Sequence, residues 1–162
     1  MPVSELLKKM IVFSQGNLHD INHFLKVYAY AKTIGELEQL DQETQLILEA
    51  AAITHDIACP LCRAKYGNTN GKHQEREGDP MVREFLKNSG LSEAQVDQAA
   101  WLVGHHHTLD PVQGIDHQIL LEADYLVNAD ESRYSTENIL HTRKLLFKTK
   151  AGISLLDSVY NL

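Results

Sequence analysis

Two copies of the tripeptide His-Asp-Ile are the feature of this sequence with the clearest capacity for chemistry. One copy begins at His19 and the other at His55. A His beside an Asp can hold a divalent metal ion, work as an acid–base pair or be structural, because imidazole titrates near neutral pH and also ligates metals. The position of each pair in its helix distinguishes these roles.

The first pair stands where a helix is predicted to begin, directly after the polar segment Ser-Gln-Gly-Asn. An Asp at such a position is expected to cap or offset the unpaired N–H groups of the first helical turn. We therefore interpret Asp20 as structural. His19 and His23 are four residues apart and could share a ligand, which leaves a peripheral role for His19 open.

The second pair ends the most apolar predicted helix, which covers residues 43–55. His55 lies on the same helical face as Leu48 and Ala51, so we expect its side chain to point into the core. A carboxylate at Asp56 would lose solvation there, at a cost of several kcal/mol unless another charge compensates it. A metal ion would provide that charge. The alternative is a core histidine beside an aspartate of the C-terminal turn.

Two more polar side chains lie on otherwise apolar helix faces. His23 precedes Val27 by four residues, and Asp124 precedes Val127 by three. With the second His-Asp pair they make a set of two imidazoles and two carboxylates, expected to point inward from separate helices or their ends. That donor set suits a six-coordinate divalent ion with open water positions better than a closed tetrahedral zinc site.

The elements that must position these residues are helices, because apolar residues recur at helical spacing and strand-like alternation is scarce. We predict an all-α bundle of about seven or eight helices. The predicted helices cover residues 4–13, 20–40, 43–55, 80–87, 92–104, 116–130, 135–148 and 151–162. The polar residues 58–80 are predicted to form a long irregular loop, a type of segment that is often functional.

Length and composition bound the class of protein. The 162 residues fit a single domain spanning 1–162, and no apolar run is long enough for a membrane span or a signal peptide. We therefore expect a cytoplasmic protein without a membrane partner, and its oligomeric state stays open. The net charge of −7 argues against broad nucleic-acid binding, although a bound metal would still allow a small phosphorylated ligand. Cys59 and Cys62 are expected to be loop thiols in a reducing compartment.

The order of these residues resembles the HD-domain superfamily of metal-dependent phosphohydrolases, whose pattern is a His on one helix, a His-Asp pair ending a later helix, and a further Asp. The segments HFLKVYAYAKTI, AAAITHDI and LLEADYLVNADE match that pattern in order, over residues 20–130. The resemblance implies an HD-type helical bundle in which Asp56 both binds metal and orients the attacking water. The metal ligands that it implies are His23, His55, Asp56 and Asp124.

Many members of this superfamily hold a second metal through paired histidines that precede the last Asp, and the segment WLVGHHHTL resembles that region. The resemblance implies His105 and His106 as ligands. His107 becomes a ligand if the register shifts by one residue. The alternative is a solvated run of histidines at a helix end.

One departure from the family pattern leaves the number of metals open. Binuclear members usually place a His four residues before a Gly, where this chain has Gln74. His73 or Glu77 could substitute, and otherwise the second metal is weak or absent. The implied cofactor is therefore one or two divalent ions, with Mn, Fe, Ni, Co, Mg and Zn all open.

The resemblance implies hydrolysis of a small phosphorylated molecule, a nucleotide or another phosphate ester, by a phosphomonoesterase or phosphodiesterase. The metal would lower the pKa of water and polarise a phosphoryl oxygen. Cationic side chains would balance the phosphate, although each could equally be a solvated surface cation. The cationic candidates are Lys26, Arg63, Lys65, Lys72 and Arg76. Two alternatives stay open: a di-iron oxygenase on the same fold, and a module that senses a nucleotide or metal without turnover.

Overall fold

The computed structural model describes residues 2–162, and all regular secondary structure in that range is helical. This confirms the predicted all-α class. Nine helices lie in the described range: α1 (Val3–Phe13), α2 (Leu18–Leu37), α3 (Gln42–Thr54), α4 (Cys59–Tyr66), α5 (Gly71–Phe85), α6 (Glu93–Val103), α7 (Gly114–Glu131), α8 (Thr136–Leu145) and α9 (Lys150–Val159).

Side-chain caps set where several helices begin. The side chain of Asp41 accepts a hydrogen bond from the backbone N–H of Thr44 at 2.9 Å, and Ser92 forms a reciprocal capping box with Gln95. The cap of α2 is Asn17, whose side chain accepts from the N–H of Asp20 at 3.1 Å. Asp20 therefore lies inside the first turn of α2 and leaves its carboxylate available for another partner.

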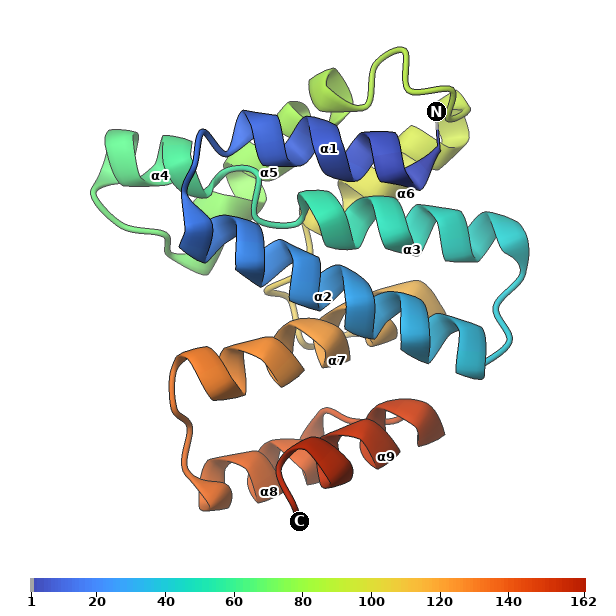
Figure 1. Ribbon diagram of the computed structural model, residues 1–162, viewed down its shortest axis with the longest axis vertical. Coiled ribbons are helices and arrows are strands. Elements are labelled where there is room, and N and C mark those ends of the chain that lie inside the picture. The colour runs from blue at the N-terminus through green and yellow to red at the C-terminus, as the bar shows by residue number, and fades with distance from the viewer. Residues whose placement is uncertain (1) are drawn as a thin grey trace.

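Helices α2, α3 and α7 form the centre of the molecule. α2 packs against both α3 and α7, and α3 also contacts α1 and α6 (Figure 1). Residues 47–54 of α3 are all buried, as predicted for a central helix. Three consecutive alanines, 50–52, are fully buried there. Their small side chains let helices approach α3 from several sides, because interaxial distance depends on side-chain size.

The prediction of an irregular loop over residues 58–80 is wrong, because this segment contains α4 and residues 71–80 of α5. Pro60 stands in the first turn of α4, where its missing N–H costs nothing, and Gly67 ends that helix with a φ of 72°. α5 continues through the exposed Pro80. Its buried stripe contains Gln74 and Gly78 as well as apolar residues. Apolar residues alone therefore do not recur at helical spacing in this part of the sequence.

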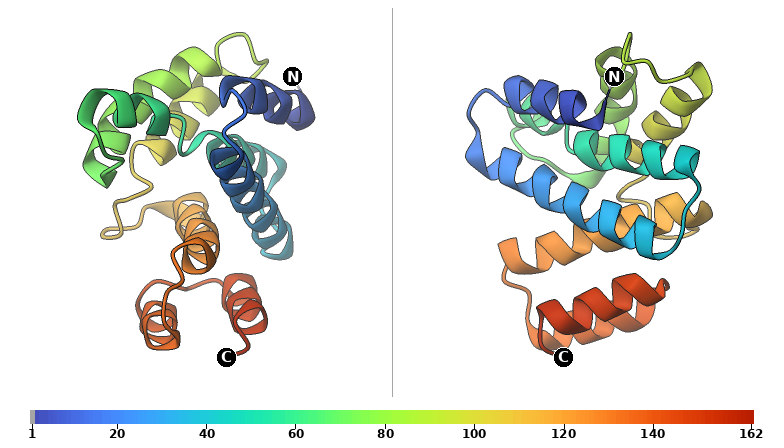
Figure 2. Two further views of the ribbon diagram at one scale, coloured as in Figure 1. Left: turned by 60° about the vertical axis from the view of Figure 1, so that its left-hand side comes forward. Right: turned by 45° about the vertical axis from the view of Figure 1, so that its right-hand side comes forward.

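Helices α8 and α9 form a layer of their own on the side of α7 that faces away from α1 and α3 (Figure 2). α9 contacts α7 and α2, whereas Ile139 is the one buried residue of α8. Within the described residues, no helix is both long and apolar enough to cross a membrane.

One buried carboxylate fastens this layer to α7. Glu122 is fully buried and accepts hydrogen bonds from the backbone N–H groups of Lys148 and Thr149, at 3.1 and 3.2 Å, and from the Thr149 hydroxyl at 2.6 Å. Because Glu122 lies two residues before Asp124, the same part of α7 carries both the fastening and a predicted metal ligand.

We expect Glu122→Ala to lower the free energy of unfolding by about 3 kcal/mol, since it leaves buried donors unpaired and opens a cavity. Urea denaturation followed by circular dichroism measures this. Glu84→Ala removes a carboxylate whose side chain is 79% exposed and should change stability by less than about 0.5 kcal/mol. If both substitutions changed the free energy of unfolding equally, Glu122 would not hold the layer of α8 and α9 to α7.

Candidate metal centre

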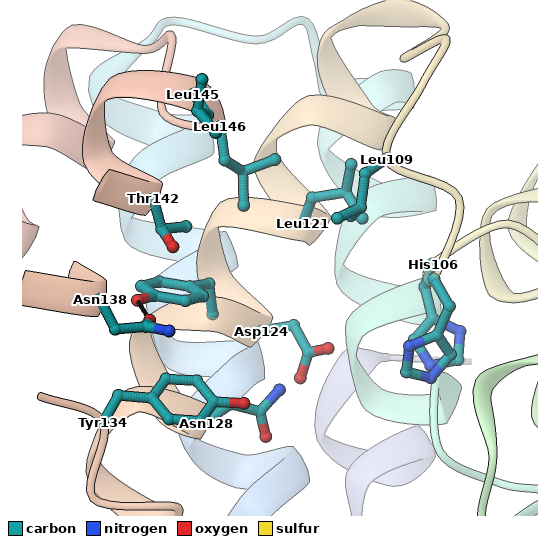
Figure 3. Close-up of a pocket in the computed structure, with 12 residues that line it drawn as sticks. His106, Leu109, Leu121, Asp124, Asn128, Tyr134, Asn138, Thr142, Leu145 and Leu146 are labelled. Atoms are coloured by element: carbon teal, nitrogen blue, oxygen red, sulfur yellow. Dashed lines mark hydrogen bonds between the residues drawn. The ribbon is translucent and has the colours of Figure 1, made fainter. Parts of the chain in front are cut away.

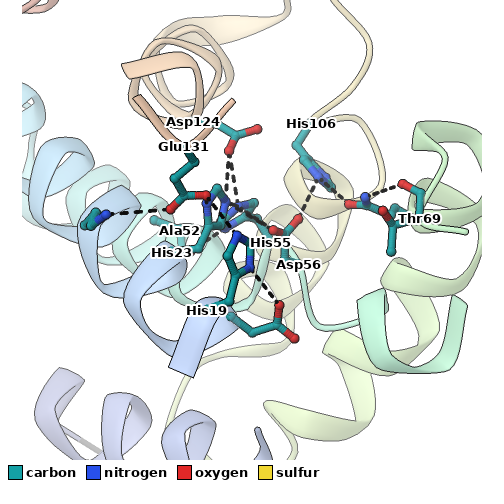
Figure 4. Close-up of polar contacts among 12 residues, drawn as sticks. His19, His23, Ala52, His55, Asp56, Thr69, His106, Asp124 and Glu131 are labelled. Atoms are coloured by element: carbon teal, nitrogen blue, oxygen red, sulfur yellow. Dashed lines mark hydrogen bonds and ion pairs between the residues drawn. The ribbon is translucent and has the colours of Figure 1, made fainter. Parts of the chain in front are cut away.

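The structure brings the four residues of the predicted first metal site to one point, from α2, the end of α3, and α7 (Figure 4). Nε2 of His23 lies 3.1 Å from Nε2 of His55, 3.1 Å from Oδ2 of Asp56 and 3.2 Å from Oδ1 of Asp124. His55 is fully buried and His23 is 5% exposed. Residues separated by about a hundred positions in sequence thus share one small volume of the interior.

The outer nitrogens of both imidazoles are held by acceptors. Nδ1 of His23 donates to Oε2 of Glu131 at 2.9 Å, and Nδ1 of His55 donates to the backbone carbonyl of Ala52 at 2.7 Å. Since a carboxylate and a carbonyl can only accept, each Nδ1 carries the hydrogen and each Nε2 presents a lone pair to the cluster. A hydrogen bond of this kind on the outer nitrogen is the usual arrangement for a metal-ligating histidine.

The centre of the cluster needs a cation. Two Nε2 lone pairs face each other and two carboxylates, and Oδ1 of Asp124, which lies 3.2 Å from Nε2 of His23, is buried without a donor in hydrogen-bonding geometry. The neighbouring carboxylates favour a proton on Nε2 of His23: burial lowers the pKa of this imidazole, but its contacts with Asp124 and Asp56 outweigh burial and raise the pKa to about 11. A divalent ion would replace that proton and satisfy the unpartnered oxygen, so the residues present fit a metal.

A second group of donors adjoins the first through Asp56. Nδ1 of His106 donates to the backbone carbonyl of Val103 at 2.6 Å, and its Nε2 lies 3.5 Å from Oδ1 of Asp56. Asp56, His106 and His107 can place one ligand atom each within 4.8 Å of one another. The two oxygens of Asp56 therefore face different groups, Oδ2 toward His23 and Oδ1 toward His106, as a bridging carboxylate would.

Comparisons with known proteins agree with this geometry. A sequence model of the HD domain matches residues 20–129, more than half of the chain. The chain belongs to the HD-domain family. A crystal structure of a predicted HD superfamily hydrolase from an uncultured Thermotogales bacterium has a similar fold, with a TM-score of 0.69, 21% sequence identity, and coverage of 98% of this chain and 84% of that chain. A comparison with curated proteins finds no match.

The histidine run of this HD domain does not follow the register predicted first. α6 ends at Val103, so the three histidines occupy a turn. His105 turns away from the cluster: its Nδ1 donates to the carbonyl of Trp101 at 2.7 Å, and the two rings stack with centroids 4.1 Å apart. The predicted pairing of His105 with His106 is therefore not what the structure assembles. The pair beside Asp56 is His106 and His107, the alternative shifted by one residue.

The residue that completes the second group is Gln74, on the buried stripe of α5. Its Oε1 lies 3.2 Å from Nε2 of His106 and 3.0 Å from Nε2 of His107. The two suggested substitutes have other partners. His73 stacks on Tyr66, and Glu77 accepts hydrogen bonds from Lys65 and Tyr66 at 2.8 and 2.6 Å. Gln74, which stands four residues before Gly78 in the sequence, thus contacts both histidines of the second group.

A polar hollow of about 210 Å³ lies over the first cluster and is lined by residues of both groups. Of the five predicted substrate-binding cations, Arg63 is the one that lines it. Lys26 does not line the hollow, and its Nζ lies 3.8 Å from Oε1 of Glu131. Lys65 forms an ion pair with Glu77. Lys72 and Arg76 are exposed elsewhere on α5 and likewise do not line the hollow.

The first His-Asp pair lies at the edge of the same hollow. Asp20 accepts two hydrogen bonds from the guanidinium of Arg63, at 2.8 and 2.7 Å, and so fixes the orientation of that cation. Nε2 of His19 is 3.7 Å from Glu131. Asp20 and Glu131 are parts of the site that the sequence patterns did not predict. Glu131 follows Asp124 by seven residues, two helical turns, and that spacing was the available signal.

Alanine substitution of neighbouring histidines tests the register of the run. We expect His106→Ala to weaken Mn²⁺ binding more than about 100-fold at one site, because removal of even an outer partner of a ligand costs about 10–100-fold. His105→Ala should keep the metal content of the unchanged protein. Equilibrium dialysis with elemental analysis measures both, and metal loss in His105→Ala with retention in His106→Ala would contradict the register seen here.

Proposed function

We propose that this HD domain is a metal-dependent phosphohydrolase that acts on a small phosphorylated molecule, a nucleotide or another phosphate ester. The observation that carries the proposal is the buried, unpartnered Oδ1 of Asp124 among imidazole lone pairs, directly below a hollow lined by Arg63. Membership of the HD-domain family supports the same reaction class. A location in the cytoplasm stays a prediction from the sequence.

The residues proposed to hold the first ion are His23, His55, Asp56 and Asp124. For a second ion the proposed donors are Asp56, His106 and His107. The uncharged amide oxygen of Gln74 is a fourth donor. Mixed imidazole and oxygen donors suit Mn, Fe, Co, Ni or Zn, whereas Mg prefers oxygen alone. A divalent ion bound here supplies a Lewis acid for a phosphoryl oxygen and lowers the pKa of water.

The side chains of the chain itself have separate tasks in this proposal. Asp56 accepts a hydrogen from the attacking water and orients its lone pair toward phosphorus. Arg63 offers two N–H donors to the phosphate oxygens and balances their charge, as guanidinium groups commonly do. Asp20 holds that guanidinium in place, and Glu131 holds the ring of His23 with Nε2 inward. All four act on groups that line or adjoin the polar hollow.

Hydrolysis of phosphate esters by Mn²⁺-loaded protein tests the reaction, with monoesters and diesters assayed in parallel. We expect Asp56→Asn to lower kcat by about 100-fold or more, the usual range for loss of an acid–base group. Asp130→Asn, which removes an exposed carboxylate from α7, should leave kcat unchanged.

Dioxygen consumption and nucleotide binding, measured beside ester hydrolysis, separate the alternatives. A di-iron oxygenase would consume dioxygen when loaded with iron and would hydrolyse no ester. A sensing module would bind nucleotide and turn nothing over with any divalent ion. Either result would overturn the hydrolase proposal.

Matched substitutions of cations test substrate binding. We expect Arg63→Gln to raise KM for a phosphate ester about 10- to 100-fold, since a hydrogen bond to a charged group contributes about 1.5–3 kcal/mol. Lys72→Gln removes a cation from the same part of the sequence that does not line the hollow and should leave KM unchanged. Steady-state kinetics measures both, and an equal rise of KM in the two variants would argue against a specific role for Arg63.

A further inference from the structure

A second cavity, of about 400 Å³, opens on the other side of Asp124, between α7, α8 and the turn that carries the histidines (Figure 3). It shares His107, Asp124 and Asn128 with the polar hollow over the first cluster. The two spaces therefore meet at the metal centre. A molecule that occupied both would have its midpoint beside Asp124.

The walls of this cavity differ in chemistry from the polar hollow. Away from the metal centre they are mostly apolar or aromatic, and no Lys or Arg is among the lining residues. The apolar and aromatic lining consists of Leu109, Leu121, Leu145, Leu146, Tyr125 and Tyr134. An anionic group would lose its hydration there without gaining a cation, which is costly. The cavity suits an uncharged group with apolar faces.

Two amides give this cavity a polar edge. The hydroxyl of Tyr125 donates to Oδ1 of Asn138 at 2.6 Å, which orients the amide of Asn138 at the cavity wall. The amide group of Asn128 lies at the boundary with the polar hollow. Neither Asn138 Nδ2 nor the Asn128 side chain makes a hydrogen bond with the part of the chain that the structure describes. A few polar groups in an otherwise apolar pocket are typical of sites that orient a ring with heteroatoms.

We propose that this cavity binds the organic part of the substrate, and that the substrate is a phosphate monoester of an uncharged, ring-bearing alcohol such as a nucleoside. The inference rests on the proposed function, since it places the phosphate in the polar hollow beside Arg63. The scissile phosphorus then lies near Asp124, where the two spaces meet. A second phosphate at the far end of the substrate would lie against a wall without cations. Substrates with such a phosphate should therefore bind more weakly.

Most of the cavity wall opposite the metal centre lies outside the match to the HD domain. Tyr134, Asn138, Thr142 and Leu145 all lie beyond residue 129, where the match to the HD domain ends. The proposed metal ligands and the base of the cavity belong to the matched domain, whereas the opposite wall consists of α8 and the residues Tyr134 and Leu146 beside its ends. Changes in α8 should therefore alter which substrate is bound without altering the metal centre.

Binding of nucleosides without phosphate tests the cavity apart from the reaction. Isothermal titration of Mn²⁺-loaded, full-length protein with adenosine and thymidine should give saturable binding, and glycerol at the same concentrations should give none. We expect Thr142→Trp, which fills the cavity from α8, to weaken nucleoside binding at least tenfold. His141→Trp places the same ring on the adjacent, exposed position of α8 and should bind as the unchanged protein does.

Leu145→Trp fills the cavity from a second position and should repeat the effect, and elemental analysis and thermal unfolding show whether each variant keeps its metal and fold. In kinetics, Thr142→Trp should raise KM for nucleoside monophosphates while leaving hydrolysis of glycerol phosphate unchanged. No binding of either nucleoside, or equal binding by Thr142→Trp and His141→Trp, overturns this inference even if esters are hydrolysed. Nucleoside binding in a protein that hydrolyses no ester would overturn the proposed function and leave the cavity assignment standing.

Discussion

The organising constraint of this protein is the close approach of lone pairs and carboxylates inside the core. Nε2 of His23 lies 3.1 Å from both Nε2 of His55 and Oδ2 of Asp56, and all three are electron-rich. Such a set is stable in a poorly solvated site only when a cation joins it. The three helices that supply the groups must also hold their positions against the repulsion. The fully buried alanines 50–52 of α3 allow that close and rigid packing.

Outer contacts determine which atoms the cluster presents. Glu131 and the carbonyls of Ala52 and Val103 each take the Nδ1 hydrogen of one histidine, on α2, at the end of α3 and in the turn after α6. The Nε2 lone pairs consequently all face inward. Asp56 then connects the two groups of donors through its separate oxygens. The lone pairs that the site presents thus depend on hydrogen bonds made on the outer side of each imidazole.

The carboxylates of the two His-Asp-Ile copies differ in their partners rather than in the degree of their burial. The side chain of Asp20 is 15% exposed and that of Asp56 is 26% exposed, so the less exposed carboxylate belongs to the copy at the helix start. Asp20 has a protein cation, Arg63, as a bidentate partner. Asp56 faces imidazoles instead, and charge compensation there has to come from outside the chain or from protons.

The sequence by itself determined the helical class and the buried central helix, and it predicted that His23, His55, Asp56 and Asp124 meet. Helical spacing places His23, His55 and Asp124 on inward faces, and Asp56 directly follows His55. Tertiary structure decided the rest. Which histidines of the run turn inward depends on the path of a turn after α6, where helical spacing no longer applies. The contact of Gln74 with those histidines, the guanidinium of Arg63 over the hollow and the cavity under α8 arise between elements distant in the chain, and no local pattern of residues encodes such contacts.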